Sequence, residues 1–263
     1  MDGDQLLVRL RVEIRSLMVG WVGEKQSEDY WRSPLLAVAS ASDPLFSELR
    51  RVVDPEHAMP EELLPGARSV LVFFLPFQEL LGEENDRFGF HAARSWAEAY
   101  VVTNRIIQAV NSHLNSLLEQ AGYRSTITPA THNFDEKKLV SRWSHKHLAY
   151  IAGLGTFGHH HQLITASGCC GRLGSIVTEM PLPATPRPSA QWCLTKAGRQ
   201  CYACVAKCPC GALSEDDFNR RRCYGQCLAN DAYYKDLPLV DVCGKCGCAV
   251  PCSYGIPAPL ILT

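Results

Sequence analysis

Cysteines are the residues of this chain with the clearest capacity for chemistry. The sequence has 263 residues and 13 cysteines, and most of the cysteines lie between Cys193 and Cys252. A secreted disulfide framework usually has an even number of cysteines, and its precursor opens with a basic and then an apolar segment, which this sequence lacks. We therefore expect a cytoplasmic protein with reduced thiols, where clustered cysteines usually bind metal.

The spacing of these cysteines favours two 4Fe-4S clusters. Cys201, Cys204 and Cys208 precede Pro209 in a C-x2-C-x3-C-P pattern, and a second C-x2-C pair lies downstream. Bacterial two-cluster ferredoxins use C-x2-C-x2-C-x3-C-P, in which the last cysteine ligates the other cluster. The usual first cysteine would stand at Gly198, and Cys193 is the nearest substitute. Crossed ligation then gives one set of Cys193, Cys201, Cys204 and Cys252, and another of Cys208, Cys223, Cys243 and Cys246.

Five cysteines remain outside these two sets: Cys169, Cys170, Cys210, Cys227 and Cys248. Small buried residues are the simplest interpretation of them, although Cys210, Cys227 and Cys248 could each replace a ligand. Structural zinc also uses C-x2-C pairs. The C-x3-C-P pattern and the paired second group favour iron–sulfur over zinc.

The remaining residues predict a layered domain before the cysteine-rich part. Helices are expected over residues 4–18, 43–53, 93–120 and 138–153, and strands over 35–39, 69–75 and 172–179. Mixed elements of this kind indicate an α+β class. A Pro-rich linker over 181–190 places the boundary, so we expect domains at 1–190 and 191–256 and a tail at 257–263. The sequence has no run of 18 apolar residues, so no membrane association is expected.

A glycine-rich bend follows the last predicted helix. It lets the backbone approach a flat ligand closely, whereas the alternative is a helix end and tight turn without a ligand. The candidate cofactor-binding residues are Gly153, Leu154, Gly155, Thr156, Phe157, Gly158 and His159.

Nearby polar side chains are candidate proton donors or anion contacts. Histidine titrates near neutral pH, which suits His145 and His147. Arg142 and Tyr100 are further candidates. For each of the four, the alternative is a structural role in the core or on the surface. The run His159–His161 favours a solvated loop, with His159 the member closest to a cofactor.

Residues 143–179 (WSHKHLAYIAGLGTFGHHHQLITASGCCGRLGSIVTE) resemble the AGLG-x-x-G…GSxxxE segment of epoxyqueuosine reductases and, more distantly, the core of reductive dehalogenases. Residues 63–77 are similar to a core strand of that superfamily, and the resemblance extends over about 35–255. It implies a nitroreductase-like domain that binds base-off cobalamin, followed by a bacterial two-cluster ferredoxin-like domain. The likeness is strongest to a short, anaerobe-type branch.

Two departures from that family bear on the substrate. The resemblance implies a catalytic acid, an Asp about 13 residues before the AGLG alanine. This chain has Leu139 at that position, and its nearest carboxylates are Asp135 and Glu136. Members often have a C-terminal helical-repeat domain that helps to hold tRNA, whereas this sequence stops at Thr263. With a net charge of −1, tRNA is not expected as a partner, because nucleic-acid affinity comes largely from neutralising phosphates.

These observations predict an oxidoreductase. A low-potential donor such as ferredoxin or flavodoxin would reduce the clusters, which would pass electrons to cobalamin and then to a small-molecule or corrinoid substrate. One alternative is an electron-transfer or corrinoid-activating partner protein without a substrate of its own. Another is a tRNA epoxyqueuosine reductase with a relocated acid.

Overall fold

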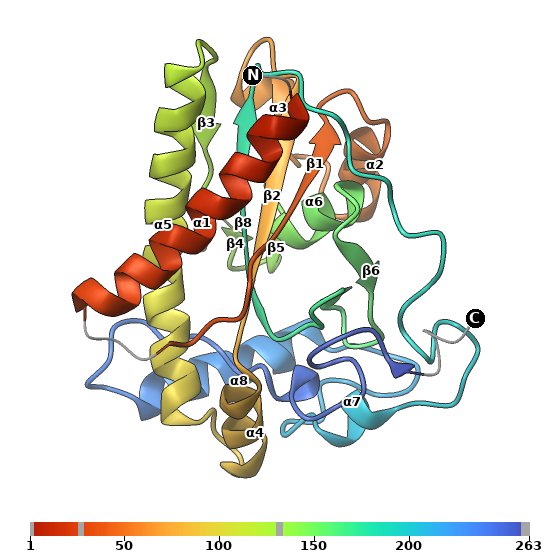
Figure 1. Ribbon diagram of the computed structural model, residues 1–263. Coiled ribbons are helices and arrows are strands. Elements are labelled where there is room, and N and C mark those ends of the chain that lie inside the picture. The colour runs from red at the N-terminus through yellow and green to blue at the C-terminus, as the bar shows by residue number, and fades with distance from the viewer. Residues whose placement is uncertain (1–2, 26–28, 130–133, 259–263) are drawn as a thin grey trace. The chain divides into compact units, whose positions relative to one another are not determined.

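The computed structural model describes residues 3–25, 29–129 and 134–258 (Figure 1). The chain forms two compact units, each assembled from separate segments. The first contains residues 1–75, 104–154 and 172–188, and the second contains 76–103, 155–171 and 189–263. The last change of unit falls near the boundary expected at 190, but two earlier segments also belong to the second unit. Of the tail expected at 257–263, residues 259–263 lie outside the described part.

A four-stranded sheet forms the centre of the first unit. Its strands are β1 (Leu35–Ser40), β2 (Ser69–Pro76), β3 (Ser125–Ile127) and β8 (Gly171–Thr178), in the order β1-β2-β8-β3. Strands β1 and β2 pair antiparallel, as do β3 and β8. Every residue of β2 is buried, as its continuous apolar sequence predicts for a strand covered on both faces.

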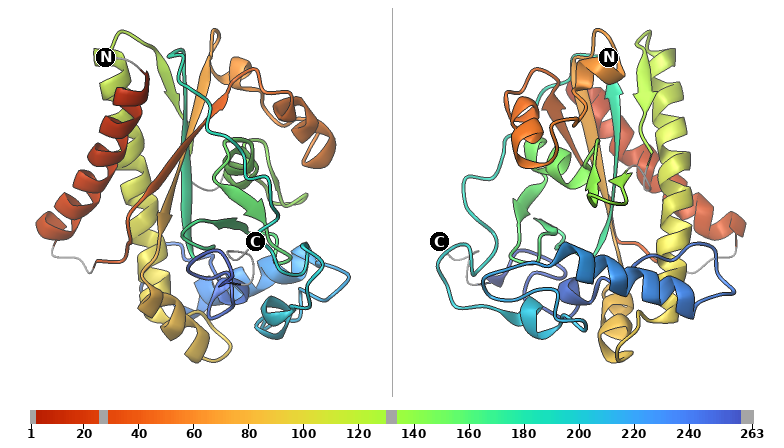
Figure 2. Two further views of the ribbon diagram at one scale, coloured as in Figure 1. Left: turned by 45° about the vertical axis from the view of Figure 1, so that its right-hand side comes forward. Right: turned by 180° about the vertical axis from the view of Figure 1, so that it is seen from behind.

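Helices cover both faces of this sheet (Figure 2). Helices α1 (Gly3–Lys25) and α5 (Arg94–Gln120) lie on one side. Helices α2 (Leu45–Val52) and α6 (His145–Ile151) lie on the other, where α6 packs against α2 and β1. On α1, Leu6, Leu10 and Ile14 are buried at a four-residue spacing, which places them on one helical face. The mixed α and β composition predicted from the sequence is confirmed.

The helix predicted over 138–153 is only partly correct. The short strands β4 (Phe134–Asp135) and β5 (Val140–Ser141) pair as a hairpin, and helix α6 begins at His145. The Asp135 carboxylate accepts hydrogen bonds from the backbone N–H groups of Lys137 and Lys138, both at 2.8 Å. Such local bonds favour a turn over a helix, and Leu139 completes it with a φ of 55°.

Short elements and loops make up much of the second unit. Besides the start of α5, these elements are α4 (Glu79–Arg87), β6 (Gly155–Phe157), β7 (Leu163–Thr165), α7 (Ala203–Ala206), α8 (Arg220–Tyr233) and the 3-10 turn η1 (Lys245–Gly247). Strands β6 and β7 form an antiparallel hairpin. In the first unit, α3 (Pro60–Leu63) is a single turn. Among the described residues, no helix is both long and apolar enough to cross a bilayer.

Candidate metal centre

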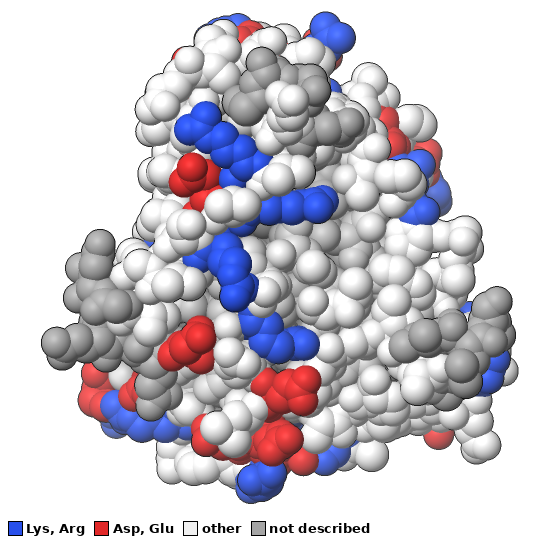
Figure 3. All heavy atoms as spheres, in the orientation of Figure 1, with Lys and Arg blue, Asp and Glu red and all other residues white. Residues whose placement is uncertain are grey.

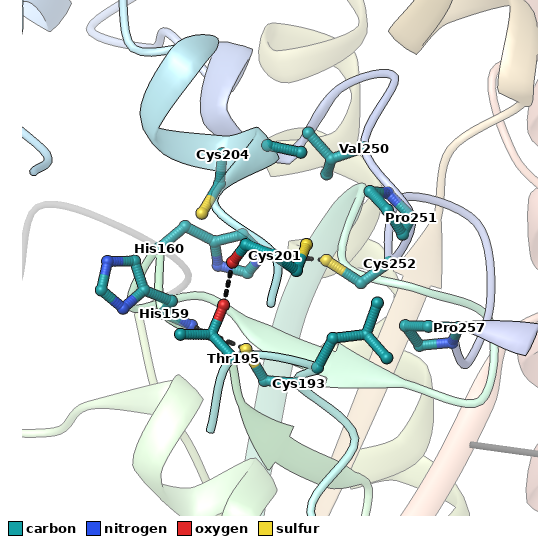
Figure 4. A pocket seen from close by; sticks show the side chains of 12 residues that line it. His159, His160, Cys193, Thr195, Cys201, Cys204, Val250, Pro251, Cys252 and Pro257 are labelled. Atoms are coloured by element: carbon teal, nitrogen blue, oxygen red, sulfur yellow. Dashed lines mark hydrogen bonds between the residues drawn. The ribbon is translucent and has the colours of Figure 1, made fainter. Parts of the chain in front are cut away.

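Four cysteines of the second unit line one pocket (Figure 4). Cys201 precedes α7, Cys204 lies within it, and Cys252 follows η1. The fourth is Cys193, and the pocket, of about 310 Å³ including space open to solvent, is also lined by His159 and His160. These are the four cysteines that the spacing assigns to one cluster.

The β6–β7 hairpin positions Cys193. The hydroxyl of Thr156, on β6, donates to Gln191 Oε1 at 2.6 Å and accepts from the backbone N–H of Trp192 at 2.9 Å. Gln191 Oε1 also accepts from the backbone N–H of Cys193 at 3.0 Å. The sulfur of Cys193 in turn accepts from the backbone N–H of His159 at 3.3 Å. The glycine-rich segment therefore fixes this cysteine through a neighbouring loop.

Residues 168–170 position Cys252. The backbone N–H of Cys169 donates to the carbonyl of Cys252 at 3.0 Å, and that of Cys170 donates to the carbonyl of Ser253 at 3.2 Å. Gly168 has a φ of 82°, and any side chain there would collide with the Ser253 carbonyl. Only glycine adopts this conformation and this approach without strain. Sequence analysis missed this contact between segments about eighty residues apart.

A second group of thiols lies in the same unit. Burial raises the pKa of Cys246, and the nearby thiols of Cys243, Cys223, Cys208 and Cys204 raise it further. Cys208 Sγ lies 3.9 Å from Cys210 Sγ, and the neighbouring Cys223 thiol is the largest cause of the raised pKa of Cys227. Six thiols besides Cys204 therefore gather here, and four of them form the second predicted set: Cys208, Cys223, Cys243 and Cys246. Cys210 and Cys227 remain alternatives, whereas Cys248 donates to the carbonyl of Gly244 at 3.3 Å.

The chemistry of these donors fits iron–sulfur clusters. Burial, and then the thiols of Cys252, Cys193 and Cys201, raise the pKa of Cys204 to about 11. Burial also raises the pKa of Cys243 to about 11. Several thiolates held this close repel one another, and bound iron removes that penalty because a coordinating thiol is deprotonated outright.

An orphaned donor supports the same fit. Trp96 Nε1 is buried and has no hydrogen-bond partner within the described parts of the chain. The indole ring lies against Gly244, the residue between Cys243 and Lys245 in the sequence. A side chain at position 244 would overlap the indole. Buried indole N–H groups usually find an acceptor, and cluster sulfur is one. The ligand assignments themselves stay predictions.

The predicted cofactor-binding bend is divided between the two units. Gly153 and Leu154 belong to the first, and Gly155 to His159 belong to the second. A Cβ at Gly155 would overlap the Ile164 carbonyl of the paired strand, and one at Gly153 would lie 2.7 Å from the Pro186 carbonyl. Close packing of the chain's own backbone explains both glycines. Corrinoid contact by this bend therefore stays a prediction. A Gly155→Val substitution would disturb the β6–β7 hairpin whether or not the bend contacts a corrinoid.

Of the predicted proton donors, His145 uses both ring nitrogens within the first unit. Its Nε2 lies 2.7 Å from the carbonyl of Pro129, which can only accept, so Nε2 carries the proton. Its Nδ1 then accepts from the Ser175 hydroxyl at 3.1 Å, and that oxygen accepts from Trp143 Nε1 at 3.0 Å. Burial is the largest cause of a His145 pKa lowered to about 4. This geometry holds a neutral imidazole.

The other candidates also have structural partners. His147 Nδ1 lies 2.7 Å from Ser144 Oγ, at the start of α6. The Arg142 guanidinium pairs with Glu56 at 2.7 Å on the surface. Tyr100 belongs to the second unit, where its hydroxyl donates to Asp241 at 2.6 Å. Backbone N–H groups, chiefly that of Lys138, lower the pKa of Asp135, so this carboxyl is a poor replacement for the missing acid.

The pKa of His145 predicts a loss of stability in acid. Its pKa is 6.5 when unperturbed and about 4 in the folded chain. The unfolded state therefore binds more protons between these pH values, and the free energy of unfolding should fall by about 1–3 kcal/mol as pH drops from 7 to 4. Burial also lowers the pKa of His57, which adds in the same direction.

Chemical denaturation followed by tryptophan fluorescence, at several pH values, measures this loss. The His145→Gln variant keeps a donor for the Pro129 carbonyl but cannot become charged. Its stability should depend less on pH than that of the wild type. Equal pH dependence in the two proteins would show that His145 is not held neutral.

Comparison with known proteins supports a relationship to reductases. No family profile matches the chain. Curated epoxyqueuosine reductases from Aliivibrio fischeri and Escherichia coli are each 27% identical to it, over 175 and 173 residues. These matches cover 63% of this chain but 42% and 41% of the two enzymes, so the chain matches less than half the length of these relatives.

Solved structures show the same fold at lower identity. The epoxyqueuosine reductase of Bacillus subtilis is 16% identical, with a TM-score of 0.58, over 97% of this chain and 67% of that one. A catabolic reductive dehalogenase is 16% identical, with a TM-score of 0.55, over 86% of this chain and 30% of that one. The predicted resemblance to this superfamily is confirmed, and the relatives are oxidoreductases.

The expectation that excluded tRNA is wrong. An epoxyqueuosine reductase solved with an epoxyqueuosine-modified tRNA stem loop matches 97% of this chain and 67% of its own length, with a TM-score of 0.61 and 16% identity. Net charge averages over the whole molecule and misses local surfaces. Helix α1 carries exposed arginines at Arg9, Arg11 and Arg15. On the face drawn in Figure 3, basic side chains form a row.

Proposed function

We propose that this chain is an iron–sulfur, cobalamin-dependent reductase. Two 4Fe-4S clusters in the second unit, which we assign a ferredoxin-like role, would receive electrons from a low-potential donor such as ferredoxin or flavodoxin. The single observation that supports this most strongly is the pocket formed by Cys193, Cys201, Cys204 and Cys252. The spacing in the sequence groups these four cysteines, and all four line this one pocket.

The chain's own residues would hold one cluster and stabilise its charge. The four thiolates would ligate its iron, and the backbone N–H of His159 donates to the sulfur of Cys193. Hydrogen bonds to sulfur and exclusion of water are the means by which proteins set cluster potentials. Near the second thiol group, Trp96 offers an N–H that has no acceptor among the described residues. The protein thus supplies geometry and electrostatics for electron transfer.

The cobalamin part of the proposal rests on likeness to the superfamily. Residues 153–159 are its proposed contact, within a nitroreductase-like first domain. Bound base-off cobalamin would supply the hard reductive chemistry, as cofactors generally do. The substrate would be a small organic molecule or another corrinoid.

Anaerobic reconstitution with iron and sulfide, with and without cobalamin, tests this proposal. We expect about eight irons per chain, cluster signals in electron paramagnetic resonance (EPR) after reduction, and a base-off cobalt(II) signal when cobalamin is added. About eight irons without bound corrinoid would overturn the cobalamin part and favour an electron-transfer partner protein. Zinc in place of iron would overturn the proposal entirely.

A second candidate substrate is epoxyqueuosine in tRNA. Curated relatives are named for that reaction, and a similar structure holds the modified stem loop. The exposed arginines of α1 could neutralise phosphates, since lysine and arginine supply most nucleic-acid affinity. Incubating the reduced, cobalamin-loaded protein with a modified stem loop, and weighing the product by mass spectrometry, tests it. Loss of one oxygen is expected, and an unchanged mass would exclude this substrate.

A further inference from the structure

His160 is buried beside the four-cysteine pocket, and its neighbours fix which nitrogen carries the proton. The side chain is 3% exposed. Its Nδ1 accepts a hydrogen bond from the backbone N–H of Gln162 at 3.1 Å. A neutral imidazole has one protonated nitrogen, so the proton lies on Nε2. That nitrogen faces Cys252 Sγ at 3.4 Å, within range of an N–H···S hydrogen bond.

A hydrogen-bonded turn over residues 158–162 holds this ring and leaves room for it. Gly158 donates its backbone N–H to the Gln162 carbonyl at 2.9 Å, and His161 donates to the Gly158 carbonyl at 3.1 Å. A side chain at Gly158 would collide with the His160 imidazole. The last glycine of the AGLGTFG segment therefore makes room for this histidine. In Figure 4 the ring of His160 lies toward Cys252, whereas that of His159 points away.

We propose that His160 is a positioning residue that raises the reduction potential of the cluster ligated by Cys252. Reduction adds negative charge to the cluster and its sulfurs, so a donor to one sulfur stabilises the reduced form more than the oxidised form. This inference rests on the proposed iron–sulfur function. Such a donor would give the two predicted clusters different potentials and so give electron flow a direction.

A mononuclear metal site is the rival explanation for the same residues. Within the described ranges, ligand atoms of His160, Cys169 and Cys252 lie within 4.8 Å of one another. Metal binding by Nε2 would need its lone pair, which moves the proton to Nδ1. The proton would then face the backbone N–H of Gln162, and two donors would oppose each other. The observed hydrogen bond therefore favours donation to sulfur over metal ligation.

Redox titration followed by EPR tests the proposal on the reconstituted protein. In His160→Leu, the midpoint potential of one cluster should become more negative by about 59 mV. For a one-electron couple this shift lowers the ratio of reduced to oxidised cluster about tenfold at a fixed potential. The other cluster should not change. His160→Gln keeps an N–H donor and should recover part of the shift. His161→Leu is the matched control, because the His161 side chain is exposed and its ring stacks on Phe218 instead.

The outcomes distinguish the role of His160 from the proposed iron–sulfur function. Two clusters with potentials unchanged in His160→Leu would overturn the role of His160 and leave the proposed function intact. Failure of the wild type to hold two clusters would overturn both. If His160→Leu does not assemble, wild-type protein with ¹⁵N-histidine decides the matter. Weak nitrogen coupling to the reduced cluster is expected, whereas strong coupling from a metal–nitrogen bond, or one extra zinc per chain, would contradict the proposal.

Discussion

Replacing Cys252 by alanine is expected to remove one cluster and about half of the iron, from about eight to about four atoms per chain. Cys252 is remote in sequence from Cys201 and Cys204, yet it lines the same pocket. Losing one of four ligands leaves that cluster open to solvent and oxidation. Iron and sulfide analysis, together with EPR of the reduced protein, measures the loss.

Cys248→Ser is the matched control for that variant. Cys248 lies four residues away and is fully buried, but its sulfur bonds the Gly244 carbonyl and accepts from Asn85. Serine keeps that donor, so the iron content should stay near that of the wild type. Full iron in Cys252→Ala would show that another thiol ligates the cluster, and Cys169 would be the first to examine because it lies against Cys252.

Replacing Cys208 by serine is expected to damage the other cluster. Cys208 continues the motif of Cys201 and Cys204, but its sulfur lies 3.9 Å from that of Cys210, whose pKa is raised by burial and also by Cys208 and Cys223. This placement agrees with the prediction of crossed ligation, in which a cysteine before proline ligates the neighbouring cluster. The signal that survives in Cys208→Ser should therefore be the one missing in Cys252→Ala.

Cys210→Ser provides the comparison for Cys208→Ser. Its sulfur lies 3.9 Å from that of Cys208, so the two thiols share nearly the same surroundings. If Cys210→Ser loses the cluster and Cys208→Ser keeps it, the ligand is Cys210. If both variants lose the signal that Cys252→Ala also loses, the two sets are not crossed.

Local patterns in the sequence were sufficient for many elements. The continuous apolar run of β2 predicted a fully buried strand, and that was confirmed. The helix over 138–153 was partly wrong because the Asp135 carboxylate organises a turn that hydrophobic periodicity does not report. Cysteine spacing also grouped the four residues that share the pocket.

What the sequence could not reveal were contacts between distant segments. In the sequence Gly168 has the features of an ordinary turn residue, whereas in the structure it packs against the Ser253 carbonyl. His160 looked like one histidine of a solvated run, whereas it is buried and faces Cys252. The glycine at 158 was the available signal, because a residue without a side chain often makes room for a neighbour. Net charge likewise could not report the exposed arginines of α1.

The discontinuous make-up of the second unit has a consequence for biogenesis. Its earliest segment, 76–103, contains Trp96, and its last contains Cys252. At about 5–20 residues per second, the ribosome needs roughly ten to thirty seconds to travel between them. Until Cys252 is made, the four-cysteine pocket is incomplete, so insertion of the proposed cluster must await its synthesis. A shortened gene product starting at residue 189 would keep the predicted ligands but lose the scaffold that orients two of them.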